Sequence, residues 1–501
     1  MINNKKQSNL FDQIKSHGNQ IAIYDQNIAY SFKYLLDKSH ALAMYFKESG
    51  LKSNDKIYIH LENQIETVLS YLACWILGAI SCPLNYRLKK DEVKHVFDQL
   101  KPNLFITDNE KYEQLKPLSL NFKIMKASEI SDVLERNYIN IDKNYYEYSD
   151  DQIASIHFTS GTMGFHKAVA HSFKQINEYT EHCVLDMEYQ INDRLIISLS
   201  LMHAFSFSYQ LLPALWLGTP CILIKKFDEK NIIEQMIQHK ATSISLLPAH
   251  CYYLSLYAEK NNKKVPTLND CLSAGDALPL AICQKFEAIF NGVKPRQGLG
   301  MTECFGYTIN PKNNNKIETA GKALINTEIK IRPLNSYDCT SGEIMIRSDG
   351  NMLGLYSDEK GLFSKPESNW VSSGDLGSID EHGYLHFKGR LRQIIIRDGS
   401  NIMPLEVENV LYRHESILEA AVCGIKDEIH GETVKAFVVL SETNLVNEEE
   451  VKAFCKEYLA DYKVPESIEF LDSLPKNATG KIDRDKLAKK EMQKQQKVAF
   501  V

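Results

Sequence analysis

Residues 159–167 of this chain read TSGTMGFHK. The stretch follows an apolar, β-prone run at 153–158 and precedes a segment, 173–183, in which apolar residues recur at helical spacing. Between the predicted strand and the predicted helix lie two glycines, three hydroxyl side chains and a lysine. Glycines let backbone N–H groups approach an anion, hydroxyls donate hydrogen bonds and lysine adds positive charge. The composition is typical of a phosphate-binding loop, although many polar surface turns share it.

Two familiar nucleotide-binding signatures do not occur in the sequence. A Walker loop ends in Gly-Lys-Ser/Thr, whereas Lys167 here follows His166. No GxGxxG sequence of the Rossmann type follows a predicted strand. The loop at 159–167 therefore indicates a phosphate site of another kind, whose partners must lie further along the chain.

The composition places broad limits on the class of protein. A length of 501 residues predicts two or more domains with a sizeable core. The net charge of −6 and the pI near 6.2 argue against a nucleic-acid-binding protein. The eleven cysteines form no CxxC pair and no Cys/His ligand spacing, so we interpret them as reduced core thiols of a cytoplasmic protein. The first ten residues lack the apolar core of a signal peptide.

One uncharged segment has the length of a membrane span. Residues 67–86 carry no charge, but Gly78 and Pro83 interrupt them. The pattern also changes from a helix at 65–77 to a short strand at 79–84. We therefore expect a buried helix and strand, and no membrane span.

The order of predicted elements indicates an α/β protein. Strand-like and helix-like runs alternate through the first 150 residues and again from 194 to about 290, which is typical of layers around a largely parallel sheet. Beyond Lys316 short strands and glycines predict a small β unit. The last hundred residues mix helices at 405–413 and 448–458 with strands at 420–424 and 434–440, and the tail from Lys486 is expected to be frayed.

Four further motifs carry residues suited to nucleotide chemistry. They are QGLGMTE at 297–303, SSGD at 372–375, GRLRQIIIRDGSNIMPLEVE at 389–408 and PKNATGKIDR at 475–484. Glycines allow backbone and ligand to approach closely, and a Glu carboxylate is a hard oxygen ligand that suits Mg²⁺. Taken singly, each motif is also explained by a tight turn, a capped turn or a solvated lysine.

Together the five motifs resemble those of the adenylate-forming superfamily, which comprises acyl-CoA synthetases, peptide-synthetase adenylation domains and luciferases. The resemblance covers nearly the whole chain, and PKNATGKIDR is its most specific part. The first loop departs from the usual TSGTTGxPKG at Met163, His166 and Ala168. Leu299 replaces an aromatic residue that commonly covers adenine in the family.

The resemblance implies a fold and its division into domains. It predicts a large N-terminal domain, 1–390, made of layered α/β subdomains plus a small β subdomain. A small, mobile α+β C-terminal domain, 391–501, is expected to follow, with Arg392 as the hinge between the two.

The resemblance also implies the residues of the site. The residues expected to be catalytic are Lys481, Thr302, Glu303 and His203, and Glu303 is also the expected Mg²⁺ ligand. Contacts with ATP or coenzyme A are implied for Thr159, Ser160, Gly161, Thr162, Gly164, Lys167, Gly298, Leu299, Asp375, Arg390 and Gly399. A substrate pocket is implied for Phe205, Ser206, Pro248, Gly275, Gly300 and Met301.

The implied reaction joins a carboxylate to the α-phosphate of ATP and releases Mg-pyrophosphate. The acyl-adenylate then reacts with a thiol. Amino-acid-activating relatives place an Asp in the segment that reads MHAFSF at 202–207 here, and this chain has no Asp there. We therefore expect a fatty or aryl acid without an α-amine. The segment at 273–279, SAGDALP, resembles the SAGEALP of some acyl and aryl ligases, and Asp276 is expected to cap the following helix.

The acceptor of the acyl group stays open at this point. Coenzyme A is the first interpretation, and the phosphopantetheine of a separate acyl carrier protein is the alternative. A luciferase-like monooxygenase is disfavoured because the chain ends without an SKL peroxisomal address. A non-catalytic nucleotide-binding protein is disfavoured because both Lys481 and Glu303 are present. We expect a monomer or a homodimer.

Overall fold

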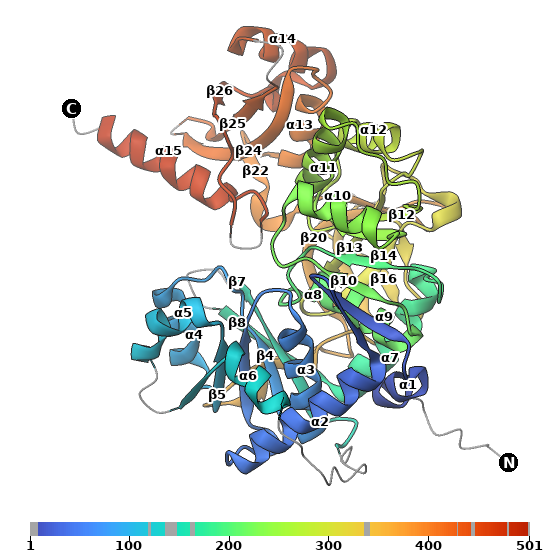
Figure 1. The fold of residues 1–501 in the computed structure, drawn as a ribbon. Coiled ribbons are helices and arrows are strands. Elements are labelled where there is room, and N and C mark those ends of the chain that lie inside the picture. Colours follow the sequence, from blue (N-terminus) through green and yellow to red (C-terminus); the bar gives the residue numbers. More distant parts are fainter. Residues whose placement is uncertain are drawn as a thin grey trace, which may run out of the picture.

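The computed structural model describes residues 9–118, 122–135, 148–160, 166–334, 341–427, 429–441, 446–477 and 480–498. Figure 1 shows two bodies of different size, with the C-terminal elements above the rest of the chain. The larger body contains two mixed sheets of eight and nine strands and a smaller sheet of four strands. No helix in these ranges is long and apolar enough to cross a membrane.

The eight-stranded sheet carries the first phosphate-loop candidate at the end of its β7–β8 hairpin. Its strand order is β19-β18-β8-β7-β4-β3-β5-β6, and the run from β7 to β6 is parallel. The bounds are β3 Lys56–His60, β4 Ile80–Pro83, β5 Leu104–Thr107, β6 Lys123–Lys126, β7 Ile153–Ser160, β8 His166–Ser172, β18 Gly354–Ser357 and β19 Gly361–Phe363.

The nine-stranded sheet supplies the other side of the site. Its order is β15-β14-β13-β12-β11-β9-β10-β1-β2, parallel from β13 to β1 and antiparallel at both ends. The bounds are β1 Ile21–Asp25, β2 Ile28–Ser31, β9 Leu195–Ile197, β10 Cys221–Leu223, β11 Ser243–Leu246, β12 Asp270–Ser273, β13 Arg296–Met301, β14 Phe305–Ile309 and β15 Lys322–Ala323.

Helices fill the space between and around these two sheets. One large apolar cluster joins residues of α2 and α3, of α7 and α9 and of strands from both sheets. A second cluster lies under α10, α11 and α12. The bounds are α1 Leu10–His17, α2 Phe32–Glu48, α3 Ile65–Leu77, α4 Lys90–Gln99, α5 Asn109–Leu115, α6 Ala127–Leu134, α7 Phe173–Met187, α8 Ala204–Ser206, α9 Leu212–Leu217, α10 Glu229–Gln238, α11 Pro248–Lys260 and α12 Leu280–Ile289.

The rest of the chain forms a small β sheet and then the C-terminal body. The small sheet has the order β16-β17-β20-β21, with bounds β16 Glu328–Pro333, β17 Gly342–Arg347, β20 Val371–Ile379 and β21 Leu385–Arg390. The C-terminal sheet, β23-β22-β25-β24 with β26 beside β25, has its own apolar clusters. Its elements are β22 Ile395–Arg397, β23 Ser400–Ile402, α13 Pro404–Leu411, β24 Ile417–Asp427, β25 Gly431–Leu440, α14 Glu448–Tyr458, β26 Ser467–Phe470 and α15 Arg484–Val498.

The predicted fold class is confirmed, and local chemistry explains several element ends. Ser172 begins α7 through a capping box with Gln175, in which each side chain accepts a hydrogen bond from the other's backbone N–H. Gly78 ends α3 in the left-handed conformation, at φ 70°. The uncharged segment 67–86 therefore contains most of the buried helix α3 and the whole of the buried strand β4, as the sequence predicted.

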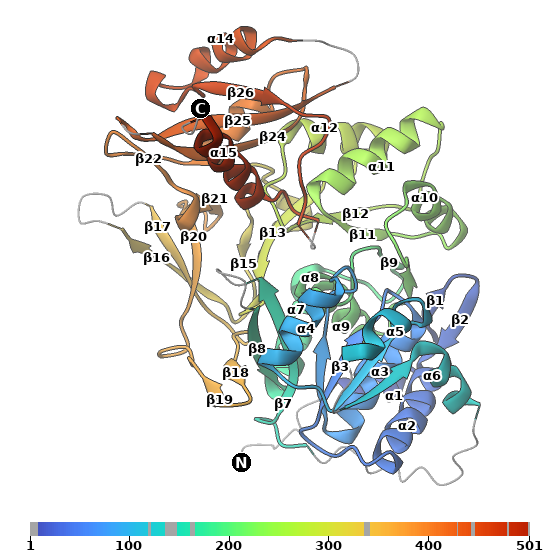
Figure 2. The same cartoon turned by 90° about the vertical axis from the view of Figure 1, so that its left-hand side faces the viewer.

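Two predictions were wrong. The first loop does not lead directly into a helix, because strand β8 lies between the loop and α7. Residues 486–498 of the tail belong to the helix α15, which packs on β24 (Figure 2). Leu487 of this helix is buried, and the Lys435 ammonium forms an ion pair with Glu491 at 2.5 Å. These contacts order a segment whose polar composition had indicated fraying.

Candidate active site

The β7–β8 hairpin positions the residues of the first motif. Thr159 lies opposite Lys167, and Ser160 lies opposite His166, at the open end of the hairpin. Gly161, Thr162 and Gly164 lie outside the described residues. Because the two strands pair up to the edge of the loop, the hairpin holds both of its ends at fixed positions.

Lys167 and Glu303 bring the first and second motifs together. The Lys167 Nζ is 4.0 Å from the Glu303 Oε1. The lysine side chain is 54% exposed and the glutamate side chain 15% exposed, so the cation faces solvent and the carboxylate lies at the bottom of the site. The pair links β8 of one sheet to the turn after β13 of the other.

His171 supports the backbone of the second motif. Its Nε2 lies 2.8 Å from the backbone oxygen of Thr302, and its ring stacks on Phe305 with 4.0 Å between centroids. Since a carbonyl can only accept, Nε2 carries the proton. Burial lowers the pKa of His171 to about 4, so the ring is neutral at pH 7. The sequence reading did not identify this residue.

Glycines permit the close β13–β14 hairpin that carries Thr302. A Cβ on Gly298 would lie 2.7 Å from the Thr308 oxygen, and one on Gly300 would lie 2.8 Å from the Phe305 oxygen. Leu299 and Met301 alternate with these glycines and lie against the cluster under the small sheet. Any larger residue at 298 or 300 would push the two strands apart.

Asp375 and Arg390 face each other on neighbouring strands. They are register partners of β20 and β21, and the Arg390 Nε lies 3.4 Å from the Asp375 Oδ1. Burial raises the pKa of Asp375, while Arg390, Lys481 and Arg392 oppose that rise. The third, fourth and fifth motifs therefore meet at this carboxylate.

Lys481 reaches this site from the C-terminal body. A Cβ on Gly275 would lie 3.4 Å from the Lys481 Cε, and Gly275 has a φ of 94°, which disfavours any side chain there. Burial and then Arg390 lower the pKa of Lys481, whereas Asp276 and Asp375 raise it. The lysine thus lies among charged groups of the larger body.

His203 lies beside Lys481. Burial, Lys481 and then Arg87 lower the pKa of His203 to about 4, so this ring is neutral at pH 7. The positive charges of Lys481 and Arg87 therefore act on a neutral ring that can donate or accept a hydrogen bond. An incoming carboxylate would meet positive charge near this ring.

The remaining predicted residues differ in their local surroundings in the fold. Phe205 packs edge-on against Tyr209 at 5.6 Å, and Ser206 is buried. Pro248 begins α11 and, with Lys481, lines a cavity between the two bodies. Gly399 forms the turn between β22 and β23, and apart from its two chain neighbours no described residue has an atom within 4 Å of the position that a Cβ would take. Arg392 is exposed in the short turn Leu391–Gln393.

Sequence reasoning missed Arg87 and misassigned Asp276. Arg87 ends the run GAISCPLNYR, where its charge reaches His203. Asp276 does not cap α12, because Pro279 occupies the N-cap position of that helix. The Asp276 Oδ1 accepts from the Ala277 N–H at 3.0 Å, and its Oδ2 faces Arg484 of the C-terminal body.

The fold and these motifs are those of a nucleotide-binding enzyme. Comparison with known families agrees: the profile described as AMP-binding enzyme matches residues 10–356, and the one described as AMP-binding enzyme C-terminal domain matches residues 406–481. This chain belongs to the AMP-binding enzyme family. The family resemblance drawn from the motifs is thereby confirmed.

Similar proteins extend over almost the full chain. The 2-succinylbenzoate–CoA ligase of Bacillus pumilus is 30% identical, over 94% of this chain and 95% of its own. The long-chain-fatty-acid–CoA ligase of Bacillus subtilis is 28% identical, over 98% and 95%. A structure of the o-succinylbenzoate CoA synthetase from Bacillus subtilis with ATP and magnesium ion has a TM-score of 0.83 at 26% identity, over 95% of this chain and 98% of that one.

Proposed function

We propose that this enzyme activates a carboxylic acid with ATP, forming an acyl-adenylate and pyrophosphate, and then transfers the acyl group to the thiol of coenzyme A. One observation carries the proposal: Lys481 lies against Gly275, beside His203 and Asp375. A carboxylate and a phosphate are both anionic, so a reaction between them requires a positioned cation. Lys481 supplies that cation.

The larger body provides the other contacts with ATP. The 159–167 loop would bind the phosphates of ATP. The residues proposed to make these contacts are Thr159, Ser160, Gly161, Thr162, Gly164 and Lys167. Asp375 accepts from the ribose hydroxyls, and Arg390 neutralises that buried carboxylate while reaching toward the phosphates. Gly298 and Leu299 border the adenine side of the same cleft.

Glu303 fits the role of the Mg²⁺ ligand. Mg²⁺ is usually held by one or two carboxylates and by substrate phosphates, and Glu303 presents one recessed carboxylate beside Lys167. Bound with ATP, the ion would neutralise phosphate charge. Thr302, whose backbone oxygen is held by His171, directly precedes Glu303 in the chain and is the proposed neighbour of the α-phosphate.

The acid would enter between His203 and the β13–β14 hairpin. Phe205, Ser206, Pro248, Gly275, Gly300 and Met301 are the proposed pocket residues. The MHAFSF segment offers no carboxylate for an ammonium group, and an uncompensated buried charge costs several kcal/mol, about 3–5 when one partner of a buried pair is missing. The acid is therefore a fatty or aryl acid that lacks an α-amine.

Coenzyme A is the preferred acceptor over a carrier protein. All three relatives described above are named as CoA ligases or CoA synthetases. Gly399, in an open turn, is the proposed passage for the pantetheine arm. The ten cysteines of the described ranges are free, buried thiols, which supports a cytoplasmic location.

The domains proposed are 1–390 and 391–501, with Arg392 as the hinge. The apolar clusters of the C-terminal body begin at Ile395, and Leu385 and Phe387 of β21 belong to the preceding cluster. The turn Leu391–Gln393 lies between them. A pivot at this turn could move Lys481 without disturbing either core.

An ATP–pyrophosphate exchange screen tests the proposed function. The acids should include short, medium and long fatty acids, aryl acids such as 2-succinylbenzoate, and the standard amino acids as comparison. The preferred acid is then supplied with coenzyme A or with a phosphopantetheinylated carrier protein. If none of the acids supports exchange, or if an amino acid supports it best, the proposal is refuted. If the acyl group is transferred faster to the carrier protein than to coenzyme A, the carrier protein is the acceptor.

A further inference from the structure

Asp276 occupies a position between the two bodies of the chain. It follows Gly275 in the loop between β12 and α12, and its side chain is 30% exposed. Its Oδ1 is engaged locally by the Ala277 N–H at 3.0 Å, which fixes the orientation of the carboxylate. Its Oδ2 is left to face the C-terminal body.

Arg484 is the group that this oxygen faces. The Arg484 Nε and Nη2 donate to the two oxygens of Glu408 at 3.0 and 2.8 Å, and Glu408 is only 2% exposed. This two-bond arrangement holds the guanidinium rigidly within its own body. The remaining nitrogen, Nη1, lies 4.0 Å from the Asp276 Oδ2.

The same carboxylate also acts on Lys481. Asp276 is the first of two carboxylates that oppose the lowered pKa of this lysine. Lys481 and Arg484 belong to one short segment, GKIDR. Asp276 therefore attracts both cations of the segment that enters the active site.

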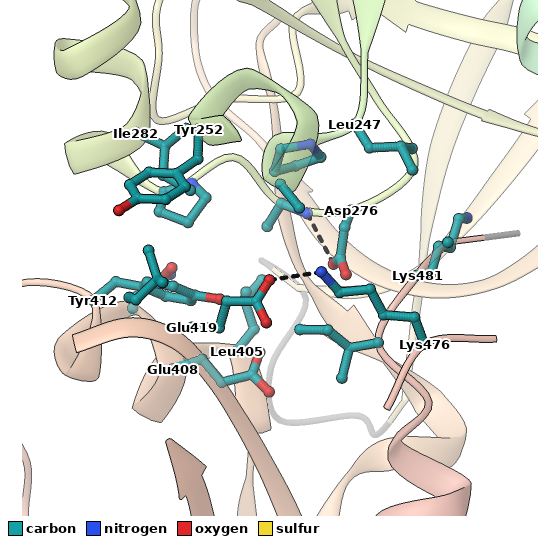
Figure 3. Close-up of a pocket in the computed structure, with 18 of the residues that line it drawn as sticks. Leu247, Tyr252, Asp276, Ile282, Leu405, Glu408, Tyr412, Glu419, Lys476 and Lys481 are labelled. Atoms are coloured by element: carbon teal, nitrogen blue, oxygen red, sulfur yellow. Dashed lines mark hydrogen bonds and ion pairs between the residues drawn. The ribbon is translucent and has the colours of Figure 1, made fainter. Parts of the chain in front are cut away.

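The interface around these groups is not a close-packed apolar surface. A cavity of about 60 Å³ lies between Leu247, Tyr252 and Ile282 on one side and Leu405 and Tyr412 on the other. Figure 3 shows the side chains of the two bodies facing each other across this space, with Lys476 and Lys481 at one edge. With a hollow interface here, polar contacts carry a larger share of the attraction between the bodies.

Lys476 forms a second contact across the interface. Its Nζ pairs with Glu419 at 2.7 Å within the C-terminal body and lies 5.5 Å from the centre of the Tyr253 ring of α11. The group that the larger body supplies to this contact, the Tyr253 ring, carries no charge. Among the contacts at this cavity, Asp276 supplies the negative charge of the larger body that faces the GKIDR segment.

We infer that Asp276 is a positioning residue, which stabilises the orientation of the C-terminal body that places Lys481 in the active site. The inference rests on the proposed function, because that orientation is the one used for adenylate formation. It predicts that Asp276 affects the first half-reaction through the population of this orientation. The second half-reaction, which needs Lys481 elsewhere, should not depend on the contact.

Asp276→Asn is the decisive variant, because an amide oxygen can still accept from Ala277 while the negative charge is lost. Its acid-dependent pyrophosphate exchange should fall about tenfold in kcat, equivalent to ~1.4 kcal/mol. Thioester formation from supplied acyl-adenylate should stay unchanged or rise. Asp276→Glu should recover most of the exchange, and Glu259→Gln, which removes a carboxylate paired with Lys285 inside the larger body, should change neither step.

A distance measurement tests the same inference without catalysis. Spin labels are attached to Lys263→Cys in the larger body and to Lys489→Cys in the C-terminal body. Cys339, the cysteine outside the described residues, is replaced by serine so that it takes no label. Pulsed electron resonance with Mg-ATP present then reports the distance between the two bodies. Asp276→Asn should shift the distance distribution away from that of the parent, and Glu259→Gln should not. Equal losses in both half-reactions, or the same distribution with and without the Asp276 charge, would overturn the inference. A parent enzyme inactive with every acid would refute the proposed function, while the distances would still decide the role of Asp276.

Discussion

The His171 Nε2 lies 2.8 Å from the backbone oxygen of Thr302, and this contact joins the two sheets of the larger body at the active site. His171 lies on β8, whereas Thr302 follows β13. The stacked Phe305 ring covers the histidine from the other hairpin strand. The position of Thr302 and Glu303 therefore depends on a buried, neutral histidine on the other sheet.

His171→Leu should lower adenylate formation and stability together. The substitution leaves a partly buried carbonyl without its donor, and the cost for a fully buried group is about 1–3 kcal/mol. We expect the KM for Mg-ATP in pyrophosphate exchange to rise by about fivefold to tenfold, since ~1.4 kcal/mol corresponds to a factor of ten. His171→Gln retains an N–H donor and should recover much of the KM. A KM unchanged in the leucine variant would show that the contact serves stability alone.

Lys481→Ala should separate the two half-reactions. Loss of one positioned charge contact typically costs a factor of about 10²–10³ in rate, so we expect acid-dependent pyrophosphate exchange to fall by that amount. Supplied with preformed acyl-adenylate and coenzyme A, the variant should still form thioester. Comparable losses in the two assays would contradict the role assigned to Lys481.

Asp186→Asn should stabilise the protein at neutral pH. Burial raises the pKa of Asp186 from 3.8 to about 6, against the Ile325 N–H and His182, which lower it. A carboxyl whose folded pKa is raised favours folding while protonated, and this contribution is lost as the pH rises from about 4 through 6. At pH 7.5 the ionised carboxylate therefore destabilises the fold.

The expected gain is about 1 kcal/mol, below the ~3 kcal/mol that two pKa units would give without relaxation. Melting curves of the parent and Asp186→Asn at pH 7.5 and pH 4.5 provide the measurement. The variant should melt a few degrees higher at pH 7.5, with little difference at pH 4.5. A larger gain at the lower pH would reverse the sign and exclude this explanation.

Local patterns predicted much of the secondary structure. The helices at 65–77 and 448–458 have the bounds that the sequence indicated. Gly78 ends the first helix, which is buried on nearly all sides, and a capping box of Asn447 and Glu450 begins the second, which buries one face. The strand β8 was missed because residues 166–172, HKAVAHS, contain a single β-branched residue, Val169, and the strand forms by pairing with β7 and β18. The helix α15 was missed because ion pairs with distant residues stabilise it.

The residues of the candidate site likewise divide into those that the sequence identified and those that it did not. Lys481, Asp375 and Glu303 were identified because their motifs resemble those of a family. Arg87 and His171 were not, since an exposed arginine and a core histidine have ordinary local surroundings. The contact between Asp276 and Arg484 joins two segments far apart in the chain, and the sequence near either residue carries no sign of the other.

The turn at Arg392 offers a test of the proposed hinge. In this structure Leu391–Gln393 form a 3₁₀ turn, and Lys481 lies in the active site. A 3₁₀ turn has φ values of about −50° to −70°, which proline accommodates because its ring fixes φ near about −65°. Proline at 392 is therefore compatible with this orientation of the C-terminal body and resists a large change of backbone angle.

Arg392→Pro should leave pyrophosphate exchange within about tenfold of the parent and lower thioester formation by about 10² or more, roughly 2.7 kcal/mol on the second barrier. The second step needs a different orientation of the C-terminal body, and therefore different backbone angles at residue 392. Proline would exclude those angles. Arg392→Ala is the matched control, because it removes the same side chain and leaves φ free, and it should affect both steps only slightly. Both half-reactions are measured on purified protein, with a melting curve to confirm folding. If the proline and alanine variants behave alike, Arg392 is an ordinary exposed arginine and the pivot lies elsewhere.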